Sequence, residues 1–235
     1  MKIMVINPNT STSMTDHLRR ELMEIKRRDT ELTVTCPDKG PISIESAYDE
    51  ALAIPPTLEL IAKANREGYD AAILACFSDP GLFAAKEISD ILVVGIQEIS
   101  LRIATTLGSR FTILTLFKER IPHKENDVWR NRLTPYLASV RELGMSVLET
   151  DEKPDLARER IMAVAQQAVE EDGAEVIVLG CAGMVGYAEE AARELGVVVI
   201  DPTSVTLKYT EAMVEAGVVH SKRAFYARPP EKLIK

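Results

Sequence analysis

The feature that most constrains the fold is a segment that occurs twice in the chain. The glycine and cysteine of the first copy, Gly68 and Cys76, recur 105 residues later as Gly173 and Cys181 (173 − 68 and 181 − 76). In each copy a polar turn leads into an apolar run, rich in Val, Ile, Leu and Ala, that ends at the thiol. Such a run is typical of a buried parallel strand. Each cysteine should therefore lie at the carboxyl end of a strand, where open α/β sheets bind ligands.

Strand-like and helix-like patterns alternate along the whole chain. We expect strands at residues 2–6, 31–36, 70–76, 91–95, 110–115, 145–149, 175–181 and 197–200. We expect helices at residues 14–28, 57–67, 80–89, 97–107, 154–171, 184–195 and 203–216. This alternation predicts parallel sheets with helices on both faces. The pair Pro55-Pro56 predicts two helices, rather than one, in the helical pattern that begins near Ser46.

The repeat extends beyond the cysteines, because Val93–Ile96 and Val198–Asp201 match at the same distance. We therefore predict two pseudosymmetric parallel-sheet α/β domains with the active site in the cleft between them. The first comprises residues 1–97 and 206–235, and the second comprises residues 98–205. If a pseudo-twofold axis relates them, the two thiols face each other across one cleft. Chance similarity between βα units is the alternative, and it leaves both strand-end cysteines in place.

Composition excludes several classes of protein. The formal net charge of −8 and the pI near 5.1 argue against a nucleic-acid-binding surface. No apolar run approaches the roughly 20 residues of a transmembrane helix, so no membrane association is expected. Three cysteines, an odd number, and a start without a secretory leader predict a reducing compartment, the cytoplasm.

Metal and nucleotide sites are not expected either. The three histidines, which are His17, His123 and His220, lie far apart and show no zinc-ligand spacing. The glycine-rich stretch Gly180–Gly186 does not match the dinucleotide fingerprint, and no P-loop occurs.

The residues after the two strand-end cysteines predict reactive thiols. Asp79 and Pro80 are a good N-cap and a good first helical residue, which places Cys76 just before a helix. Cys181 is likewise followed by a small-residue turn. Amide donors and the helix dipole should lower the pKa of each thiol below about 8.5. The alternative is that each cysteine is only a small buried hydrophobe. Cys36 also ends a strand but has no symmetric partner, so we expect a packed or incidental thiol.

Polar loops at the same sheet edge are candidate substrate contacts. The loop after the first strand contains Asn9 and Thr10, for which we predict substrate binding, although helix capping alone could explain one such residue. Thr115 ends the fifth strand and forms a second candidate wall. Glu45 lies in a third loop and is either a site residue or a first-turn helix charge. Trp129 stands alone among charged residues and suits a surface, an interface or a lid.

With these residues identified, the chain resembles the hydantoin racemase branch of the aspartate/glutamate racemase superfamily, which includes allantoin racemases. The motifs that carry the resemblance are Ile6–Ser11, Cys36–Glu45, Ala75–Leu82 and Val178–Met184, with weaker support from Val199–Asp201 and Ser221–Ala227. The resemblance implies a two-domain pseudosymmetric fold, no cofactor, a homo-oligomer, and Cys76 and Cys181 as the catalytic pair. The substrate-binding residues that it implies, together with the loops above, are Asn9, Thr10, Phe77, Ser78, Thr115, Ala182 and Gly183.

The chain departs from the family pattern at several positions. Amino-acid racemases of the superfamily usually have Cys-Asn-Thr at the first cysteine, and glutamate racemases commonly have Cys-Thr-His at the second. Here the two sites read Cys76-Phe-Ser and Cys181-Ala-Gly, which favours a substrate other than a free amino acid. Ser78 replaces a common glycine and Leu116 replaces a common hydroxyl residue, so both change the expected width and polarity of the pocket.

The sequence therefore predicts an isomerase that inverts C5 of a 5-monosubstituted hydantoin, allantoin included, without a cofactor. One cysteine removes the C5 proton as a thiolate and the other delivers a proton to the opposite face. An aspartate-type amino-acid racemase is the enzymatic alternative. A non-enzymatic small-molecule-binding protein is the alternative from a different class.

Overall fold

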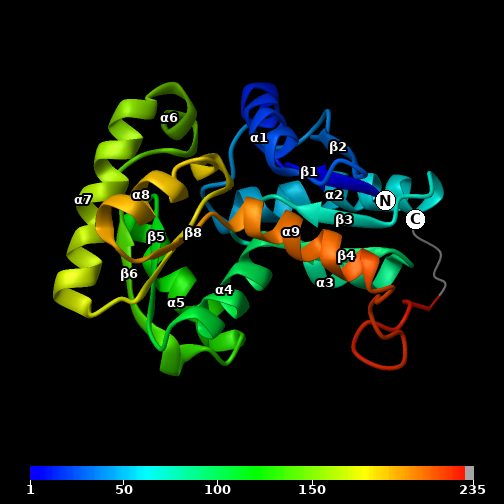
Figure 1. Cartoon of the computed structure of the whole chain (residues 1–235). Coiled ribbons are helices and arrows are strands. Elements are labelled where there is room, and N and C mark those ends of the chain that lie inside the picture. The colour runs from blue at the N-terminus through cyan, green and yellow to red at the C-terminus, as the bar shows by residue number, and fades with distance from the viewer. Residues whose placement is uncertain (231–235) are drawn as a thin grey trace.

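The computed structural model of the chain describes residues 1–230, with residue 151 described by its backbone alone. Within these residues the strands form two four-stranded parallel sheets, one in each half of the molecule (Figure 1). The first sheet contains β1 (Lys2–Ile6), β2 (Glu31–Thr35), β3 (Ala71–Leu74) and β4 (Leu92–Gly95). The second contains β5 (Phe111–Thr115), β6 (Leu137–Glu142), β7 (Val176–Leu179) and β8 (Val198–Ile200).

Helices connect the strands and cover the sheets. They are α1 (Thr12–Ile25), α2 (Ala47–Arg66), α3 (Leu82–Ile88), α4 (Ile96–Leu107), α5 (Ile121–Arg130), α6 (Val147–Glu152), α7 (Pro154–Asp172), α8 (Ala188–Leu195) and α9 (Pro202–Glu215). Short 3-10 turns are η1 (Lys118–Arg120), η2 (Thr134–Tyr136) and η3 (Ala182–Met184). No helix in the described part of the chain has both the length and the apolar composition needed to cross a bilayer.

The two sheets have the same strand order, which confirms the predicted pseudosymmetric α/β fold. The orders are β2-β1-β3-β4 and β6-β5-β7-β8. The hydrogen bonds at the strand ends match as well, since Ala75 donates to the Ile6 carbonyl and Gly180 to the Leu114 carbonyl, both at 2.8 Å. The residue after each of these donors is a cysteine. The 105-residue repeat is therefore a structural repeat, and it brings both cysteines to the carboxyl edges of their sheets.

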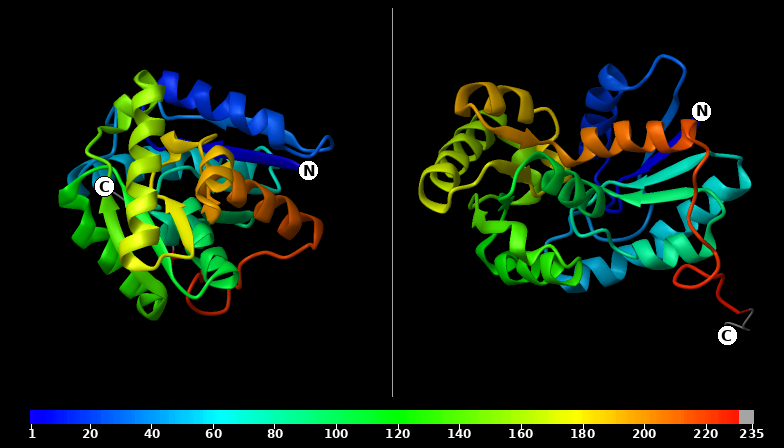
Figure 2. Two further views of the ribbon diagram at one scale, coloured as in Figure 1. Left: turned by 60° about the vertical axis from the view of Figure 1, so that its left-hand side comes forward. Right: turned by 60° about the horizontal axis from the view of Figure 1, so that its bottom comes forward.

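The two halves exchange a helix. α4 follows β4 of the first sheet but contacts β7 and β8 of the second, while α9 follows β8 and contacts β3 and β4 of the first. The two exchanged helices also pack against each other. The chain after α9 runs back along the first half (Figure 2), where the ring Nε2 of His220 accepts the Val93 N–H at 2.8 Å.

The domain division stays a prediction, although these contacts support the assignment of the C-terminal segment to the first half. The part of that segment at residues 231–235 lies outside the described residues.

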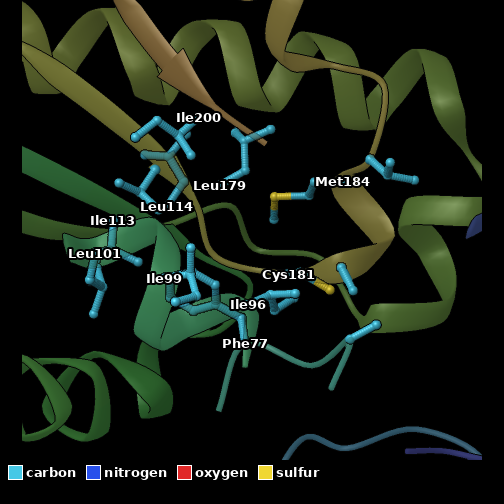
Figure 3. Close-up of a cluster of buried hydrophobic side chains, with 14 of the residues drawn as sticks. Phe77, Ile96, Ile99, Leu101, Ile113, Leu114, Leu179, Cys181, Met184 and Ile200 are labelled. Atoms are coloured by element: carbon cyan, nitrogen blue, oxygen red, sulfur yellow. The ribbon is translucent and has the colours of Figure 1, made fainter. Parts of the chain in front are cut away.

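A continuous hydrophobic core joins the two halves. It contains apolar side chains from both faces of β5 and β7, and it includes Ile96 and Leu101 of α4. Figure 3 shows Phe77, from the turn after β3, and Cys181, from the turn after β7, among the side chains of this one cluster. Because this shared core contains residues from both halves, the two cysteine-bearing turns are held in a fixed relation to each other.

The predicted strand at residues 145–149 is wrong. The sixth strand is β6, and residues 147–152 form α6 instead. A capping box explains the helix, because the Ser146 hydroxyl accepts the Glu149 N–H while the Glu149 carboxylate accepts the Ser146 N–H. β6 pairs with β5 and its burial is mixed, so its sequence lacks the apolar run that identifies the central strands.

The predicted break at Pro55-Pro56 is also wrong, because α2 is one helix that passes through both prolines. The carbonyls that lose their N–H donors belong to Ala51 and Leu52, both of which are exposed to solvent. On the opposite side of the helix, Ala53 and Ile61 are fully buried against the first half. Tertiary packing thus outweighs the local penalty of the prolines.

Asp79 does not cap the helix that follows it, contrary to the prediction. It has a positive φ of 46°, and α3 begins only after Gly81. Its carboxylate instead caps α4, accepting the N–H groups of Gln97 at 3.1 Å and Glu98 at 2.7 Å. A Cβ at Gly95 would lie 2.1 Å from the Asp79 Cγ, so only glycine leaves room for this cap.

Replacing Asp79 by alanine should lower the free energy of unfolding by about 1–2 kcal/mol, the usual effect of losing an N-cap. Burial raises the pKa of Asp79 to about 7. Because this folded-state pKa lies above the unfolded value, the carboxyl stabilises the fold most at low pH, and this stabilisation is lost as the pH rises through 7. Urea unfolding should therefore show a larger difference between wild type and Asp79→Ala at pH 5 than at pH 8. The difference in stability between Asp79→Asn and Asp79→Ala should not change with pH, because neither variant has a carboxyl at this position. A difference between wild type and Asp79→Ala that grows with pH would contradict this account.

Candidate active site

A cleft of about 520 Å³, part of it open to solvent, lies where the carboxyl ends of β1, β3, β5 and β7 meet. The cleft is lined by residues of both halves: Asn7, Asn9, Met14, Ile44, Glu45, Ala75, Cys76, Phe77, Ser78, Thr115, Leu116, Phe117, Arg120, Lys124, Val147, Gly180, Cys181 and Ala182. The two strand-end cysteines therefore share one cavity.

Cys76 is the more accessible of the two thiols. It is partly exposed in the cleft, and its Sγ lies 3.4 Å from the Ser78 hydroxyl oxygen. Burial in the protein raises the pKa of the Cys76 thiol, while hydrogen bonds from Ser78 and the charge of Lys124 act in the opposite sense. The balance is a raised pKa, so the predicted lowering is wrong for this thiol.

Cys181 is buried more deeply, with 7% of its surface exposed. Its Sγ accepts the Gly183 N–H at 3.3 Å, which matches the position of Ser78 in the first half. Burial raises the pKa of Cys181 to about 12, against the predicted lowering. The predicted helix after this cysteine is only a 3-10 turn, and α8 does not begin until Ala188. A long helix dipole therefore does not reach the thiol.

The loop after β1 presents one amide donor to the cleft. The Asn9 side-chain oxygen accepts from the Ser11 N–H at 2.9 Å and from the Asn7 amide at 2.8 Å. Its Nδ2 lies 3.3 Å from the sulfur of Met14, which is a weak acceptor. This nitrogen is thus available to donate to an oxygen in the cleft. Thr10 does not line the cleft, because its hydroxyl points to the Pro41 carbonyl at 3.3 Å.

The second wall comes from the end of β5. Thr115 and Leu116 are both almost fully buried and line the cleft. Ala182 lines it as well, whereas Gly183 contributes its N–H to Cys181 and is not itself part of the lining. Phe77 and Ser78 line the cleft beside Cys76.

Glu45 bridges the two halves at the cleft. It lines the cavity, and its Oε1 accepts the Val147 N–H at 3.1 Å, at the start of α6. Ser46, the next residue, is the N-cap of α2, so Glu45 is not a first-turn charge of that helix. A second bridge is the ion pair between Glu50 of α2 and Arg120 of η1.

Two other singled-out residues lie elsewhere. Cys36 is partly buried and is not among the lining residues. Trp129 lies on α5 with 67% of its surface exposed. Among the side chains that the structure describes, no three of His, Cys, Asp or Glu are grouped so that they could hold a metal ion.

Lys124 is a site residue that is absent from the sequence-based predictions. It is a buried lysine in the cleft wall, with only 4% of its surface exposed. Burial lowers the pKa of its ammonium group. The sequence does contain a sign of this position, because Ile121, Lys124 and Val128 are spaced so that they share one face of a helix, α5. Because a lysine occupies one of the inward positions of this polar stretch, the apolar periodicity is weak, and neither the helix nor the site residue could be recognised from it.

The arrangement suits proton transfer at a carbon atom. Two thiols from opposite halves border one cavity, and each has a backbone or side-chain donor beside it. A carbon bound between them would present one face to each sulfur. Amide donors nearby, such as that of Asn9, can stabilise an oxyanion formed when the proton leaves.

Comparisons with known proteins agree with this geometry. The family model described as Asp/Glu/Hydantoin racemase matches residues 3–210. The chain is 40% identical to a hydantoin racemase of Pseudomonas sp. (strain NS671), over 99% of this chain and 93% of that protein. It is 34% identical in sequence to the solved allantoin racemase from Klebsiella pneumoniae, with a TM-score of 0.96 over 100% of this chain and 96% of that one.

The solved allantoin racemase from Pseudomonas fluorescens is similar as well, with a TM-score of 0.94, 32% identity and complete coverage of both chains. The family model and these relatives each cover most or all of the chain, including both cysteine-bearing strand ends. The chain is therefore a member of the Asp/Glu/hydantoin racemase family.

Proposed function

We propose that this protein is a cofactor-independent racemase that inverts C5 of 5-monosubstituted hydantoins, with allantoin among its candidate substrates. The observation that carries the proposal is the pair of matched thiols, Cys76 and Cys181, in one cleft of a chain of this family. Binding alone requires no thiol, whereas inversion of a carbon requires an acid and a base on opposite faces.

The reaction proceeds by two proton transfers. One cysteine, as a thiolate, takes the C5 proton, and the electrons of the C–H bond delocalise onto the adjacent ring carbonyl as an enolate. The second cysteine, as a thiol, delivers its proton to the opposite face of C5 and becomes the thiolate. The reverse reaction exchanges the two roles, as interconversion of mirror-image substrates requires. Each well-placed acid or base contributes about 10²–10⁴-fold to the rate.

The thiol environments suggest which cysteine is ionised first. Cys181 is the more deeply buried of the two thiols, and burial raises its pKa to about 12. Cys76 is less buried and feels both the Ser78 hydrogen bonds and the Lys124 charge. We therefore assign the resting thiolate to Cys76 and the resting thiol to Cys181.

The lining supports a cyclic ureide better than a free amino acid. A free amino acid needs anchors for its carboxylate and its ammonium group. The charged groups of the cleft already have partners, because Arg120 pairs with Glu50 and Glu45 accepts the Val147 N–H. The third, Lys124, donates to the Phe77 carbonyl and lies 3.6 Å from Asp127. A neutral ring carbonyl needs only donors, such as the Asn9 amide.

The test is incubation with single enantiomers of 5-benzylhydantoin, 5-isopropylhydantoin, allantoin and aspartate, followed by chiral chromatography. We expect at least one of the three ureides to become racemic and aspartate to stay unchanged. Racemisation of aspartate alone would establish the amino-acid racemase instead. Tight binding of a ureide without any inversion, together with insensitivity to iodoacetamide, would establish a binding protein.

Two further properties stay predictions. A homo-oligomer is expected from the family resemblance, and light scattering at several concentrations measures its order. A cytoplasmic location is expected from the cysteine usage and is measured by cell fractionation.

A further inference from the structure

The carbonyl of Phe77, directly after Cys76, accepts hydrogen bonds from two buried side chains. Gln97 of α4 donates its Nε2–H at 3.0 Å, and Lys124 of α5 donates from its ammonium group. Gln97 is 5% exposed and Lys124 is 4% exposed. Lysine is almost never fully buried unless it is paired, so this position is costly and calls for a physical explanation.

Asp127 fixes both donors. Its Oδ2 accepts from the Gln97 amide at 3.0 Å and lies 3.6 Å from the Lys124 ammonium group. Lys124 also lies 5.2 Å from the centre of the Phe77 ring, over its face. We call Gln97, Lys124 and Asp127 the carbonyl clamp. Two helices, α4 and α5, thus converge on a single peptide group next to the more accessible thiol.

Fixing the Phe77 carbonyl also orients the Ser78 N–H, because both groups belong to the same peptide. A trans peptide is planar, so its N–H points away from its C=O. With the Phe77 carbonyl turned toward the clamp, the Ser78 N–H of the same peptide is turned the other way. The side chain of the same residue places its hydroxyl oxygen 3.4 Å from the Cys76 Sγ. In the second half, the matched carbonyl of Ala182 accepts the backbone N–H of Val185 at 3.2 Å instead.

The clamp also adds a positive charge to the cleft. The groups that act on Cys76 electrostatically are Lys124 from α5, which favours its thiolate, and Glu50 from α2, which disfavours it. Cys181 faces the same space and feels Lys124, Cys76 and Glu45. Near Lys124 lie Arg120 and Asp127, and the carboxylate of Glu50 is paired with Arg120. Burial disfavours the ammonium charge of Lys124, whereas the carboxylate of Asp127, 3.6 Å away, and the Cys76 thiolate favour it.

We propose that the carbonyl clamp positions the Cys76 turn for catalysis, and that Lys124 makes Cys76, rather than Cys181, the thiolate that starts the reaction. This proposal deepens the proposed racemase function and rests on it for its catalytic meaning. Gln97, Lys124 and Asp127 are positioning residues, since they act through the Phe77–Ser78 peptide and through their charge. The halves of the fold are pseudosymmetric, but the clamp makes their two thiols chemically different.

The test measures the ionisation of Cys76 without any substrate. In a Cys36→Ser/Cys181→Ser background, Cys76 is the sole thiol, and the rate of its alkylation by iodoacetamide is followed from pH 6 to pH 10. Lys124→Met removes the charge and keeps an unbranched side chain of similar length. We expect the titration midpoint to rise by about one pH unit or more, and the rate at pH 7.5 to fall about tenfold. Lys118→Met removes the same charge from an exposed position just upstream and should change neither quantity.

Gln97→Leu is the second variant, because it loosens the peptide without changing any charge. It should also slow alkylation of Cys76 at pH 7.5, by less than Lys124→Met does. Circular dichroism and a melting curve establish that each variant is folded. An unchanged midpoint and rate in folded Lys124→Met, equal to those of the Lys118→Met control, would overturn the proposal.

Turnover then separates this proposal from the proposed function. With Cys36→Ser as the parent, Lys124→Met should lower kcat about 10- to 100-fold with little change in KM, and should shift the alkaline rise of kcat to higher pH. If the parent racemises hydantoins while Lys124→Met alters neither the alkylation of Cys76 nor the pH profile, the clamp fails and the racemase stands. If the alkylation of Cys76 shifts as expected but the parent racemises no substrate, the effect of Lys124 on the Cys76 thiol is supported and the proposed racemase function is contradicted.

Discussion

Serine in place of either Cys76 or Cys181 should reduce kcat for racemisation by about 10³-fold or more, with either enantiomer as substrate. The reason is that every turnover uses both thiols, one as base and one as acid. A serine hydroxyl is far too weak an acid to supply an alkoxide at neutral pH, so it cannot replace the base. Initial rates of inversion from each pure enantiomer measure the effect.

The matched control is Cys36→Ser. Cys36 is a third thiol of the same chain that follows the edge strand β2 and does not line the cleft. Its variant should keep the wild-type rate. A single variant, Cys76→Ser or Cys181→Ser, with more than about a tenth of the wild-type kcat would refute the two-thiol mechanism.

Gly180→Ala should be the most damaging substitution that leaves both thiols in place. A Cβ at Gly180 would lie 2.3 Å from the carbonyl oxygen of Leu114 and 3.2 Å from the Cγ2 of Ile113. The obstacle is backbone, and the same carbonyl accepts the Gly180 N–H at 2.8 Å, so β5 and β7 must separate at their ends. Cys181 and Thr115 follow directly after these two positions and would move with them.

We expect Gly180→Ala to lower the free energy of unfolding by about 1–3 kcal/mol, as for other overpacked sites. It should also lower kcat about 10²-fold, since a misplacement of about 1 Å has that effect at a catalytic group. Urea unfolding and initial rates measure the two quantities. Gly173→Ala is the control, because it lies before the same strand, its Cβ would meet nothing within 4 Å, and its φ of +68° strains only the turn. Gly173→Ala should lose stability but keep kcat, whereas wild-type kcat in Gly180→Ala would contradict the account.

The sheets and the catalytic pair could be predicted because their signals are local and repeated. The buried strands β3 and β7 are continuous apolar runs, and each ends one residue before the glycine or alanine that precedes a cysteine. Strand order then follows from the βα alternation, and both thiols come to one edge. Seven of the eight predicted strands correspond to strands of the structure, and the exception is the one predicted at residues 145–149. The edge strand β6 was not predicted, because its mixed sequence has no apolar run.

The elements that the sequence analysis missed depend on contacts between distant segments. α2 continues through Pro55-Pro56 because its buried face packs on the first half, and no local pattern records this. Asp79 caps α4 rather than α3, since the turn that carries it brings the carboxylate to a helix sixteen residues later in sequence (95 − 79, counted to the N-cap). Lys124 is difficult to recognise for a related reason, because the carbonyl to which it donates belongs to Phe77, in another element.

The error in the thiol pKa values has one physical cause. The sequence indicates the amide donors and the helix starts that follow each cysteine, but not the loss of solvent around each sulfur. Burial is the largest influence on both cysteines, and it raises both pKa values. How deeply a strand end is buried in the cleft depends on how the two halves pack. The sequence therefore predicts which residues are the acid and base, but not the pKa values of their thiols.

The central claim, that two thiols act on opposite faces of one carbon, is tested most directly by initial-rate inversion of one enantiomer of the ureide that is turned over fastest, in D₂O. The product enantiomer and the remaining substrate are separated by chiral chromatography and analysed by mass spectrometry for deuterium at C5. The two-thiol account predicts deuterium in essentially all of the product and almost none in the remaining substrate, since the proton is delivered by a second, solvent-exchanged cysteine. Product that retains the original hydrogen would show that one group carries the proton between both faces, and would contradict the account.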